Sequence, residues 1–263
     1  MFFSCLLFAG KSEFYLNIPN PPEHSGLKGI DCLYVINLAR RSQKWALTKF
    51  RLEEWGLHPH RVEAVDGWAI SDAKKKELTG DFAPKMNGGK LGCFLSHLSI
   101  YRDAMKRNFH AIWVFEDDIL VCCNPHQISR VIEELSILDP DWDVLYTDFD
   151  TRNKAGDPLT PQKRHLDLRN PYIKLKPAES YFSRRRITEE LSTTGFRWGM
   201  YSMVISKKGV QKLVRTFDAL PLWAPIDHLI HYIPDIYEYS LVRPVVTVDR
   251  KSTISDTLRK ANF

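Results

Sequence analysis

Short apolar runs alternate with longer amphipathic stretches along the first part of the chain. Residues 32–36 form a β-branched apolar run that ends at Asn37, which predicts a buried strand. Residues 41–55 have helical periodicity, and residues 62–65 form a second short apolar run. We expect Trp45, Leu52 and Trp55 to lie on one face of this helix. Ser42 is the expected cap at its start, and Gly56 is expected to end it. The order strand, helix, strand predicts a parallel βαβ unit with a right-handed crossover.

The alternation continues through most of the remaining chain. A second helix is predicted to begin after Asn87 and to end at Asn108, with Leu91, Leu95, Leu98 and Met105 on its apolar face. Further strands are predicted over 111–115, 144–146 and 199–205, and further helices over 128–138 and 206–217. Residues 151–197 are instead polar and rich in proline, which predicts a long excursion that carries substrate specificity. The whole pattern is typical of the α/β class.

One large domain is expected from the length and composition. The 263 residues, 44% of them hydrophobic, suffice for a single core. We place this domain at residues 31–256, with a C-terminal subregion. An apolar leader and an irregular segment rich in proline and glycine precede it over residues 1–30, and a tail follows over residues 257–263.

Charge and cysteine content narrow the classes of partner and the compartment. A net charge of +5 is too diffuse to indicate nucleic acid, but it suits an anionic small molecule or peripheral contact with a membrane. Five cysteines without regular spacing predict free thiols in a reducing compartment. We therefore expect a cytoplasmic protein, either free or at the inner face of a membrane. The apolar run over residues 1–10 is shorter than the ~20 residues that span a bilayer, and a secretory signal stays open as the alternative.

The most informative stretch for chemistry is the apolar run over residues 112–115, which leads directly into Glu116, Asp117 and Asp118. Three adjacent carboxylates at the end of a buried strand repel one another unless a cation neutralises them. Ligands of open α/β sheets bind at the carboxyl ends of the strands, and carboxylates prefer hard ions such as Mg²⁺ or Mn²⁺. The triplet predicts a divalent-metal site, with a solvated acidic loop as the alternative.

An ordered set of motifs from about residue 31 to residue 256 resembles glycosyltransferase family 25, which includes lipooligosaccharide and collagen galactosyltransferases. The motifs are Val35-Ile36-Asn37-Leu38 with Arg40 and Arg41, Ala64-Val65-Asp66-Gly67, Leu91 to His97, Phe115 to Asp118, Trp142 to Tyr146, Met203 to Ser206 with Gly209, and Pro225-Ile226-Asp227. Each motif alone has little specificity, whereas the ordered set is specific.

The resemblance implies a GT-A-type, Rossmann-like fold that binds a nucleotide sugar. It implies metal coordination by Glu116 and Asp118, with Asp117 facing the ribose or the sugar as a catalytic-site residue. It also implies a donor pocket lined by Asn37, Arg40, Asp66, Ser96 and His97. Two alternatives stay open from the residues themselves: Arg40 pairs with a surface carboxylate, or His97 is a core histidine.

The family implies inverting transfer of a sugar, best matched by galactose from a UDP-sugar, to a glycan or lipooligosaccharide hydroxyl. Asp227 is the candidate base, and the alternative is that it caps the helix beginning near Ile226. Two other functions stay open: a metal-dependent phosphoryl-transfer or phosphodiester-cleaving enzyme, and a non-catalytic protein that binds a glycan or nucleotide sugar.

Two stretches depart from the family pattern. Asp148 and Asp150 add a second acidic pair after the strand over 144–146, and we expect them at the edge of the site. The excursion over 151–197 matches no family motif, which leaves the acceptor undefined. The run Arg184-Arg185-Arg186 within it predicts contact with an anionic acceptor or with lipid headgroups, and a solvated basic loop is the alternative.

Overall fold

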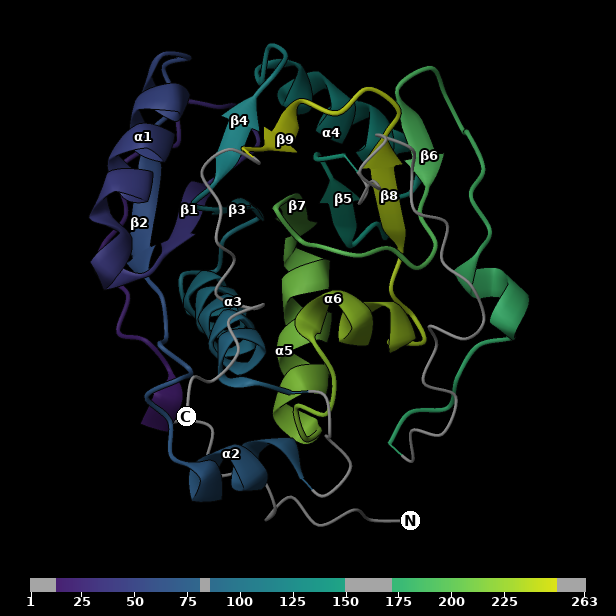
Figure 1. The fold of residues 1–263 in the computed structure, drawn as a ribbon. Coiled ribbons are helices and arrows are strands. Elements are labelled where there is room, and N and C mark those ends of the chain that lie inside the picture. Colours follow the sequence, from purple (N-terminus) through teal and green to yellow (C-terminus); the bar gives the residue numbers. More distant parts are fainter. Residues whose placement is uncertain (1–12, 81–85, 150–171, 250–263) are drawn as a thin grey trace.

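A seven-stranded mixed sheet forms the centre of the protein in a computed structural model that describes residues 13–80, 86–149 and 172–249 (Figure 1). The strand order is β2 (Pro59–Glu63), β1 (Cys32–Asn37), β3 (Ala111–Glu116), β7 (Ser202–Ser206), β5 (Val144–Tyr146), β8 (Glu238–Leu241) and β6 (Leu191–Thr193). β2, β1 and β3 are mutually parallel, whereas β7 runs antiparallel to both of its neighbours, β3 and β5. β8 is parallel to β5, and β6 is antiparallel to β8.

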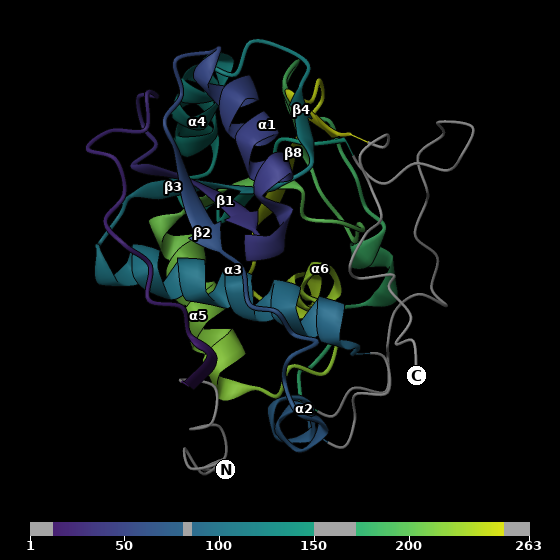
Figure 2. The same cartoon turned by 60° about the vertical axis from the view of Figure 1, so that its left-hand side comes forward.

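Helices cover both faces of this sheet, as Figures 1 and 2 show. One face packs against α1 (Ser42–Glu53) and α4 (Gln127–Leu138), and the other packs against α3 (Gly88–Lys106), α5 (Lys207–Ala219) and α6 (Ile226–Leu229). Alternate residues of β3 enter the two cores: Val114 lies with α3 and α5, and Trp113 lies with α1 and α4. The α/β prediction is confirmed, and burial on both faces explains why β1 and β3 are apolar up to their last residues, Asn37 and Glu116.

Several predicted elements are confirmed with small shifts. β1, β3, β5, α3, α4 and α5 lie where the sequence places them, and β1 and β2 form the expected parallel pair. Gly56 and Asn108 end their helices with φ angles of 68° and 60°. β2 begins at Pro59 rather than at residue 62, and β7 begins at Ser202 rather than at residue 199.

Two details of the predicted helices are wrong. Ser42 does not cap α1, because a 3-10 turn (Ala39–Arg41) leads into the helix and makes Arg41 its N-cap. Met105 is 44% exposed and does not belong to the apolar face of α3. Within the predicted excursion over 151–197, β6 joins the main sheet; residues 150–171, which include Asp150, lie outside the described residues.

One α-helix and four strands of the described residues were not predicted from the sequence. These are α2 (Asp72–Thr79), β4 (Ile119–Val121), β9 (Val246–Val248), β8 and β6. β4 and β9 pair as a separate two-stranded sheet at the carboxyl side of β3. The four missed strands are three or four residues long and carry partly exposed residues, so they show no continuous apolar run.

The segment before β1 packs against the domain as far as the structure describes it. In residues 13–30, the Tyr15 hydroxyl donates to Asp218 over 2.8 Å, and the Leu16 amide donates to the Ser99 hydroxyl over 3.1 Å. The predicted leader over 1–10 and the tail over 257–263 lie outside the described residues. No helix in residues 13–80, 86–149 or 172–249 is long and apolar enough to cross a membrane.

Candidate active site

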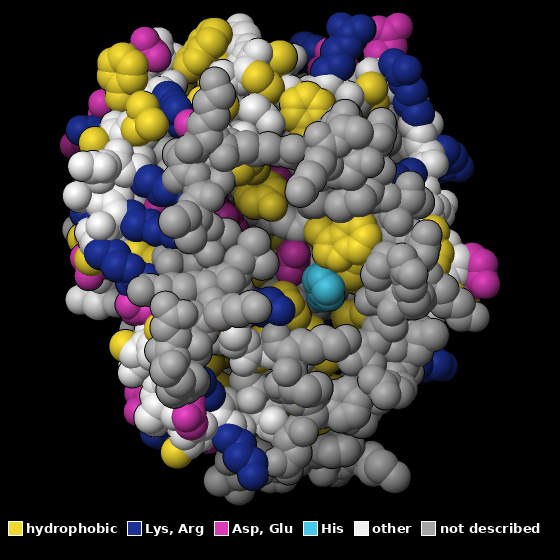
Figure 3. All heavy atoms as spheres, in the orientation of Figure 1, with side chains coloured by type: hydrophobic (Ala, Val, Ile, Leu, Met, Phe, Trp, Pro, Cys, Tyr) yellow, Lys and Arg dark blue, Asp and Glu magenta, His cyan; other side chains and the backbone are white. Residues whose placement is uncertain are grey.

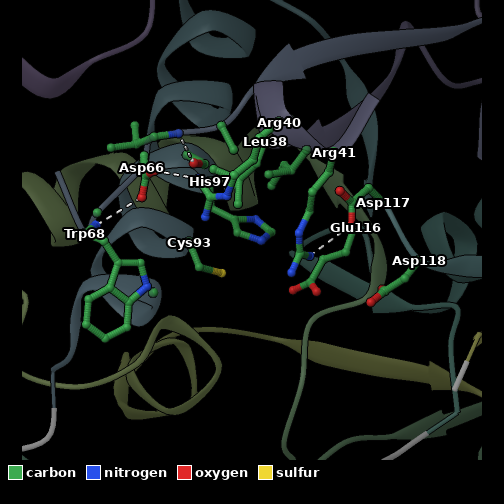
Figure 4. A pocket seen from close by; sticks show the side chains of 16 residues that line it. Leu38, Arg40, Arg41, Asp66, Trp68, Cys93, His97, Glu116, Asp117 and Asp118 are labelled. Carbon is green, nitrogen blue, oxygen red and sulfur yellow. Dashed lines mark hydrogen bonds and ion pairs between the residues drawn. The ribbon is translucent and has the colours of Figure 1, made fainter. Parts of the chain in front are cut away.

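A pocket of about 670 Å³, measured to its open mouth, lies at the carboxyl ends of β1, β2 and β3 (Figure 4). The face shown in Figure 3 is hollowed here, with acidic side chains inside the hollow. The parallel strands bring residues from distant parts of the sequence to this one edge of the sheet. The predicted site residues among its lining are Arg40, Asp66, Ser96, His97, Glu116, Asp117 and Asp118.

The acidic triplet forms the floor of the pocket. Glu116 is the last residue of β3, and Asp117 and Asp118 form the turn into β4. Burial raises the pKa of Glu116 well above its usual value, and the neighbouring carboxylates Asp118, Asp117, Asp227 and Asp148 raise it further. One oxygen of Asp118, Oδ1, is buried without a hydrogen-bond partner among the described residues. Crowded, incompletely satisfied carboxylates of this kind fit a hard divalent cation.

Asp117 is held differently from its two neighbours. It is 8% exposed, and its Oδ2 accepts a hydrogen bond from the Asn37 amide over 2.7 Å. Arg41 Nη1 and Lys44 Nζ each lie 3.9 Å from its Oδ1. Burial raises the pKa of Asp117, while Asn37 and Lys44 oppose that rise by favouring the carboxylate. Asp117 is therefore the oriented member of the triplet.

Asn37 lies beneath the pocket and holds its wall together. It is 1% exposed, and its Oδ1 accepts from Arg61 Nη2 over 2.7 Å. Its Nδ2 donates to the carbonyl of Arg41 as well as to Asp117. Because the Asn37 side-chain amide makes all these hydrogen bonds within the protein, it orients Asp117 and does not reach into the pocket.

Arg40 and Asp66 form an ion pair at the pocket mouth, where each side chain is 40% exposed. Asp66 also accepts from the Trp68 amide over 3.2 Å. The expectation that Arg40 pairs with a carboxylate is confirmed, and the pair still faces the pocket that the donor would occupy.

Ser96 supports the loop that carries Asp66. Its hydroxyl donates to the Gly92 carbonyl over 2.7 Å and accepts from the Val65 amide over 2.9 Å. This loop packs so closely on the start of α3 that a Cβ at Gly67 or Gly92 would collide with backbone atoms. Glycine at both positions therefore fixes the place of Asp66 above α3.

His97 is fully buried at the back of the pocket. Its Nδ1 lies 3.2 Å from the Tyr101 hydroxyl, and its Nε2 has no hydrogen-bond partner in the described part of the chain. Burial lowers the pKa of His97 to about 3, so the imidazole is neutral at physiological pH. His97 is thus a buried histidine whose Nε2 is not satisfied by the described residues.

Asp227 approaches the acidic triplet from the other half of the sheet. Its Oδ2 accepts from the Gly199 amide over 2.9 Å, whereas α6 has Pro225 at its N-cap and no side-chain cap. The capping alternative for Asp227 is therefore wrong. Burial raises the pKa of the nearby Tyr201, and the carboxylates of Glu116, Asp148, Asp118 and Asp227 add to that rise. Tyr201 thus lies among four acidic side chains.

Asp148 is buried beside this group and forms an ion pair within the protein. It is 3% exposed, and it accepts from Arg197 Nη2 over 3.0 Å. Arg197 is 1% exposed and lies over the Tyr146 ring, 4.3 Å from its centroid. The charge of Asp148 is thereby compensated inside the protein.

The model of "Glycosyltransferase family 25 (LPS biosynthesis protein)" matches residues 31–230. The chain belongs to glycosyltransferase family 25. The predicted resemblance is confirmed over a region that includes the pocket, the triplet and Asp227.

Family 25 members with curated names align with parts of the chain. Mouse "Inactive glycosyltransferase 25 family member 3" is 32% identical over 140 residues, which cover 49% of this chain and 24% of that protein. Mouse "Procollagen galactosyltransferase 2" is 28% identical over 148 residues, 51% of this chain and 23% of that protein. Zebrafish "Procollagen galactosyltransferase 1" is 24% identical over 226 residues, 82% of this chain and 33% of that protein. The chain spans about a quarter to a third of the length of these relatives.

One solved structure aligns with most of the chain. It is a glycosyltransferase involved in the glycosylation of the major capsid of PBCV-1, with 12% identity and a TM-score of 0.41. The alignment covers 84% of this chain and 94% of that one. The likeness is too low to transfer any feature of the site.

Several side chains of the site were not predicted from the sequence. Lys44 and Tyr201 belong to no motif, and Cys93 and Arg41 lie inside motifs without an assigned role. A signal existed for Cys93, since Cys93 and His97 are four residues apart on a helix and therefore share one face. For Tyr201 no signal existed, because its place depends on the pairing of β3 with β7.

Proposed function

We propose that this member of family 25 transfers a sugar from a nucleotide-sugar donor to a hydroxyl group of a glycan or lipooligosaccharide. The observation that carries the proposal is the acidic group at the end of β3, in which Asp118, Asp117, Asp227 and Asp148 all raise the pKa of Glu116. An excess of carboxylates in a pocket at the carboxyl ends of parallel strands suits a divalent ion and a diphosphate.

Galactose from a UDP-sugar is the donor that we propose. It is supported by relatives that are named procollagen galactosyltransferases and by the family's description as lipopolysaccharide biosynthesis proteins. The pocket offers the Arg40–Asp66 pair at its mouth and Trp68 on its wall as contacts for the nucleotide.

Glu116 and Asp118 would hold Mn²⁺ or Mg²⁺. The fit rests on the crowding of their carboxylates and on the unsatisfied Asp118 Oδ1. When bound, the ion supplies Lewis-acid stabilisation for the negative charge of the departing diphosphate. Asp117, oriented by Asn37, would contact the ribose or the sugar.

Asp227 is the proposed general base for inverting transfer. The Gly199 amide fixes one of its oxygens, and its charge acts on Glu116 and Cys93, which places it beside the pocket floor. Its carboxylate would take the proton of the acceptor hydroxyl as that oxygen bonds to the anomeric carbon. The bond between the anomeric carbon and the diphosphate oxygen breaks in the same step.

A second candidate is a non-catalytic protein that binds a nucleotide sugar. The observation that favours it is that relatives at 29–32% identity, such as the mouse and human proteins, are named inactive members of the family. The described triplet and Asp227 are present together in this chain, and for that reason we favour transfer.

The deciding experiment is a panel of nucleotide-sugar donors, assayed for nucleotide release and for a glycosylated acceptor by mass spectrometry. We expect transfer from UDP-galactose with Mn²⁺ and none in excess chelator. Donor binding by calorimetry without product would establish the non-catalytic candidate. Release of phosphate or nucleotide from simple phosphodiesters, without sugar transfer, would instead establish a phosphodiester-cleaving enzyme.

A further inference from the structure

A second group of metal-ligating side chains shares one wall of the pocket with the acidic triplet. Cys93 and His97 lie one turn apart on α3, and Glu116 lies opposite them at the end of β3 (Figure 4). The Cys93 Sγ, a ring nitrogen of His97 and a carboxylate oxygen of Glu116 all lie within 4.8 Å of one another. Three ligand atoms this close together can share one tetrahedral ion.

The buried state of His97 points to a ligand at this place. His97 is 0% exposed, and its Nε2 has no hydrogen-bond partner among residues 13–80, 86–149 and 172–249. A buried polar atom without a partner destabilises the fold unless something bonds to it. When the Nδ1 proton is donated to the Tyr101 oxygen, 3.2 Å away, the Nε2 lone pair is left available. A histidine that binds a metal through one ring nitrogen usually donates a hydrogen bond from the other, which fixes the orientation of the ring.

The charges around the two sites differ. Arg41 and Lys44 form ion pairs with Asp117, and Lys44 also pairs with Asp118. In the described part of the chain, neither cation lies within ion-pair distance of Glu116. The wall formed by Cys93, His97 and Glu116 therefore keeps its capacity to bind a cation.

We propose that Cys93, His97 and Glu116 form a site for a soft divalent ion of the zinc class, distinct from the hard-ion pair Glu116 and Asp118. Thiolate and imidazole ligands select Zn²⁺, whereas Mg²⁺ and Mn²⁺ prefer oxygen. Binding converts the Cys93 thiol to a thiolate and releases its proton to solvent. Three protein ligands leave a fourth position that opens into the pocket.

The two sites share Glu116, so they compete. Zinc on this wall takes the carboxylate that the hard ion also uses, and zinc therefore inhibits transfer. This consequence rests on the proposed transferase function, whereas zinc binding itself does not.

The test uses Co²⁺ as a spectroscopic substitute for zinc, because a thiolate ligand gives an intense near-ultraviolet charge-transfer band that oxygen ligands do not give. The starting protein carries Cys5→Ser, Cys122→Ser and Cys123→Ser, so that Cys32 and Cys93 are its remaining thiols. Burial raises the pKa of the Cys32 thiol to about 12, and Cys32→Ser serves as the matched control.

We expect a one-to-one cobalt band that Zn²⁺ displaces, that Cys32→Ser retains and that Cys93→Ser abolishes. Tyr101→Phe removes the oxygen that orients His97 and should weaken zinc binding ~10–100-fold. Circular dichroism checks that each variant is folded. A starting protein without the band, or a band of full intensity in folded Cys93→Ser, would overturn the site. The readout needs no activity, so a chain that binds zinc but transfers no sugar refutes the transferase and not this site.

Discussion

The side-chain amide of Asn37 donates to the carboxylate of Asp117 over 2.7 Å and so joins the ends of β1 and β3 beneath the pocket. The bond links residues 80 positions apart in the sequence. Asn37 also accepts from Arg61, which follows from the pairing of β1 with β2. The three parallel strands therefore share one buried polar network under the site.

Removal of this network is expected to destabilise the protein. Asn37→Ala leaves Asp117 and Arg61 without a buried partner, which typically costs about 1–3 kcal/mol of unfolding free energy. Urea denaturation followed by circular dichroism measures the change. Asn20→Ala, which removes an exposed hydrogen bond to Arg107, is the control and should stay within about 0.5 kcal/mol. Equal stability of the two variants would refute the network's importance.

Asp118→Asn tests the hard-ion site with nearly the same side-chain shape. We expect transfer to fall at least ~10²-fold, because stabilisation of the leaving group by a metal is worth several kcal/mol. Turnover with Mn²⁺ and the melting temperature are the two measurements. Asp141→Asn changes an exposed carboxylate paired with Lys208 and is the matched control. A folded Asp118→Asn variant with near-normal turnover would remove Asp118 from the metal site.

Asp227→Asn separates a catalytic role from a structural one. An asparagine oxygen can still accept from the Gly199 amide, so the melting temperature and donor affinity should be unchanged. The variant lacks a proton acceptor, and loss of a general base typically slows a reaction ~10²–10⁴-fold. Steady-state turnover, donor binding and thermal melting decide the question. Wild-type turnover in this variant would place the base elsewhere.

Arg185 is the best probe of the predicted acceptor surface. Arg184 donates to the Phe196 carbonyl and Arg186 donates to the carbonyls of Thr188 and Glu189, so these two also support the local fold. Arg185→Gln should raise the Michaelis constant for an anionic acceptor and leave donor hydrolysis unchanged. The exposed Lys28→Gln, which breaks an ion pair with Glu133, is the control. An unchanged acceptor constant would indicate a solvated basic loop.

The part of the site carried by β1 and β3 could be predicted because its signals are local. The apolar runs of β1 and β3 mark strands buried on both faces, and the residues directly after them fall at one edge of a parallel sheet. Glu116, Asp117 and Asp118 follow from that rule alone. The helix of Cys93 and His97 was equally visible, although the approach of its side chains to Glu116 depends on packing.

The other half of the site depends on a pairing that no local pattern specifies. β7 inserts between β3 and β5 and runs against both, which brings Tyr201 and the partner of Asp227, Gly199, to the carboxyl edge. β8 and β6 are too short and too exposed for a clear periodicity. The place of Asp148 beside Arg197 likewise follows from tertiary packing.

The reversed direction of β7 has a consequence for how this architecture can diversify. Its amino end meets the pocket, so the chain between β5 and β7 both enters and leaves at the mouth of the site. Lengthening such a connection costs little free energy, since loop closure entropy grows only slowly with length. Insertions on this side can thus reshape the mouth of the pocket, while the side chains carried by β1, β2 and β3 stay untouched.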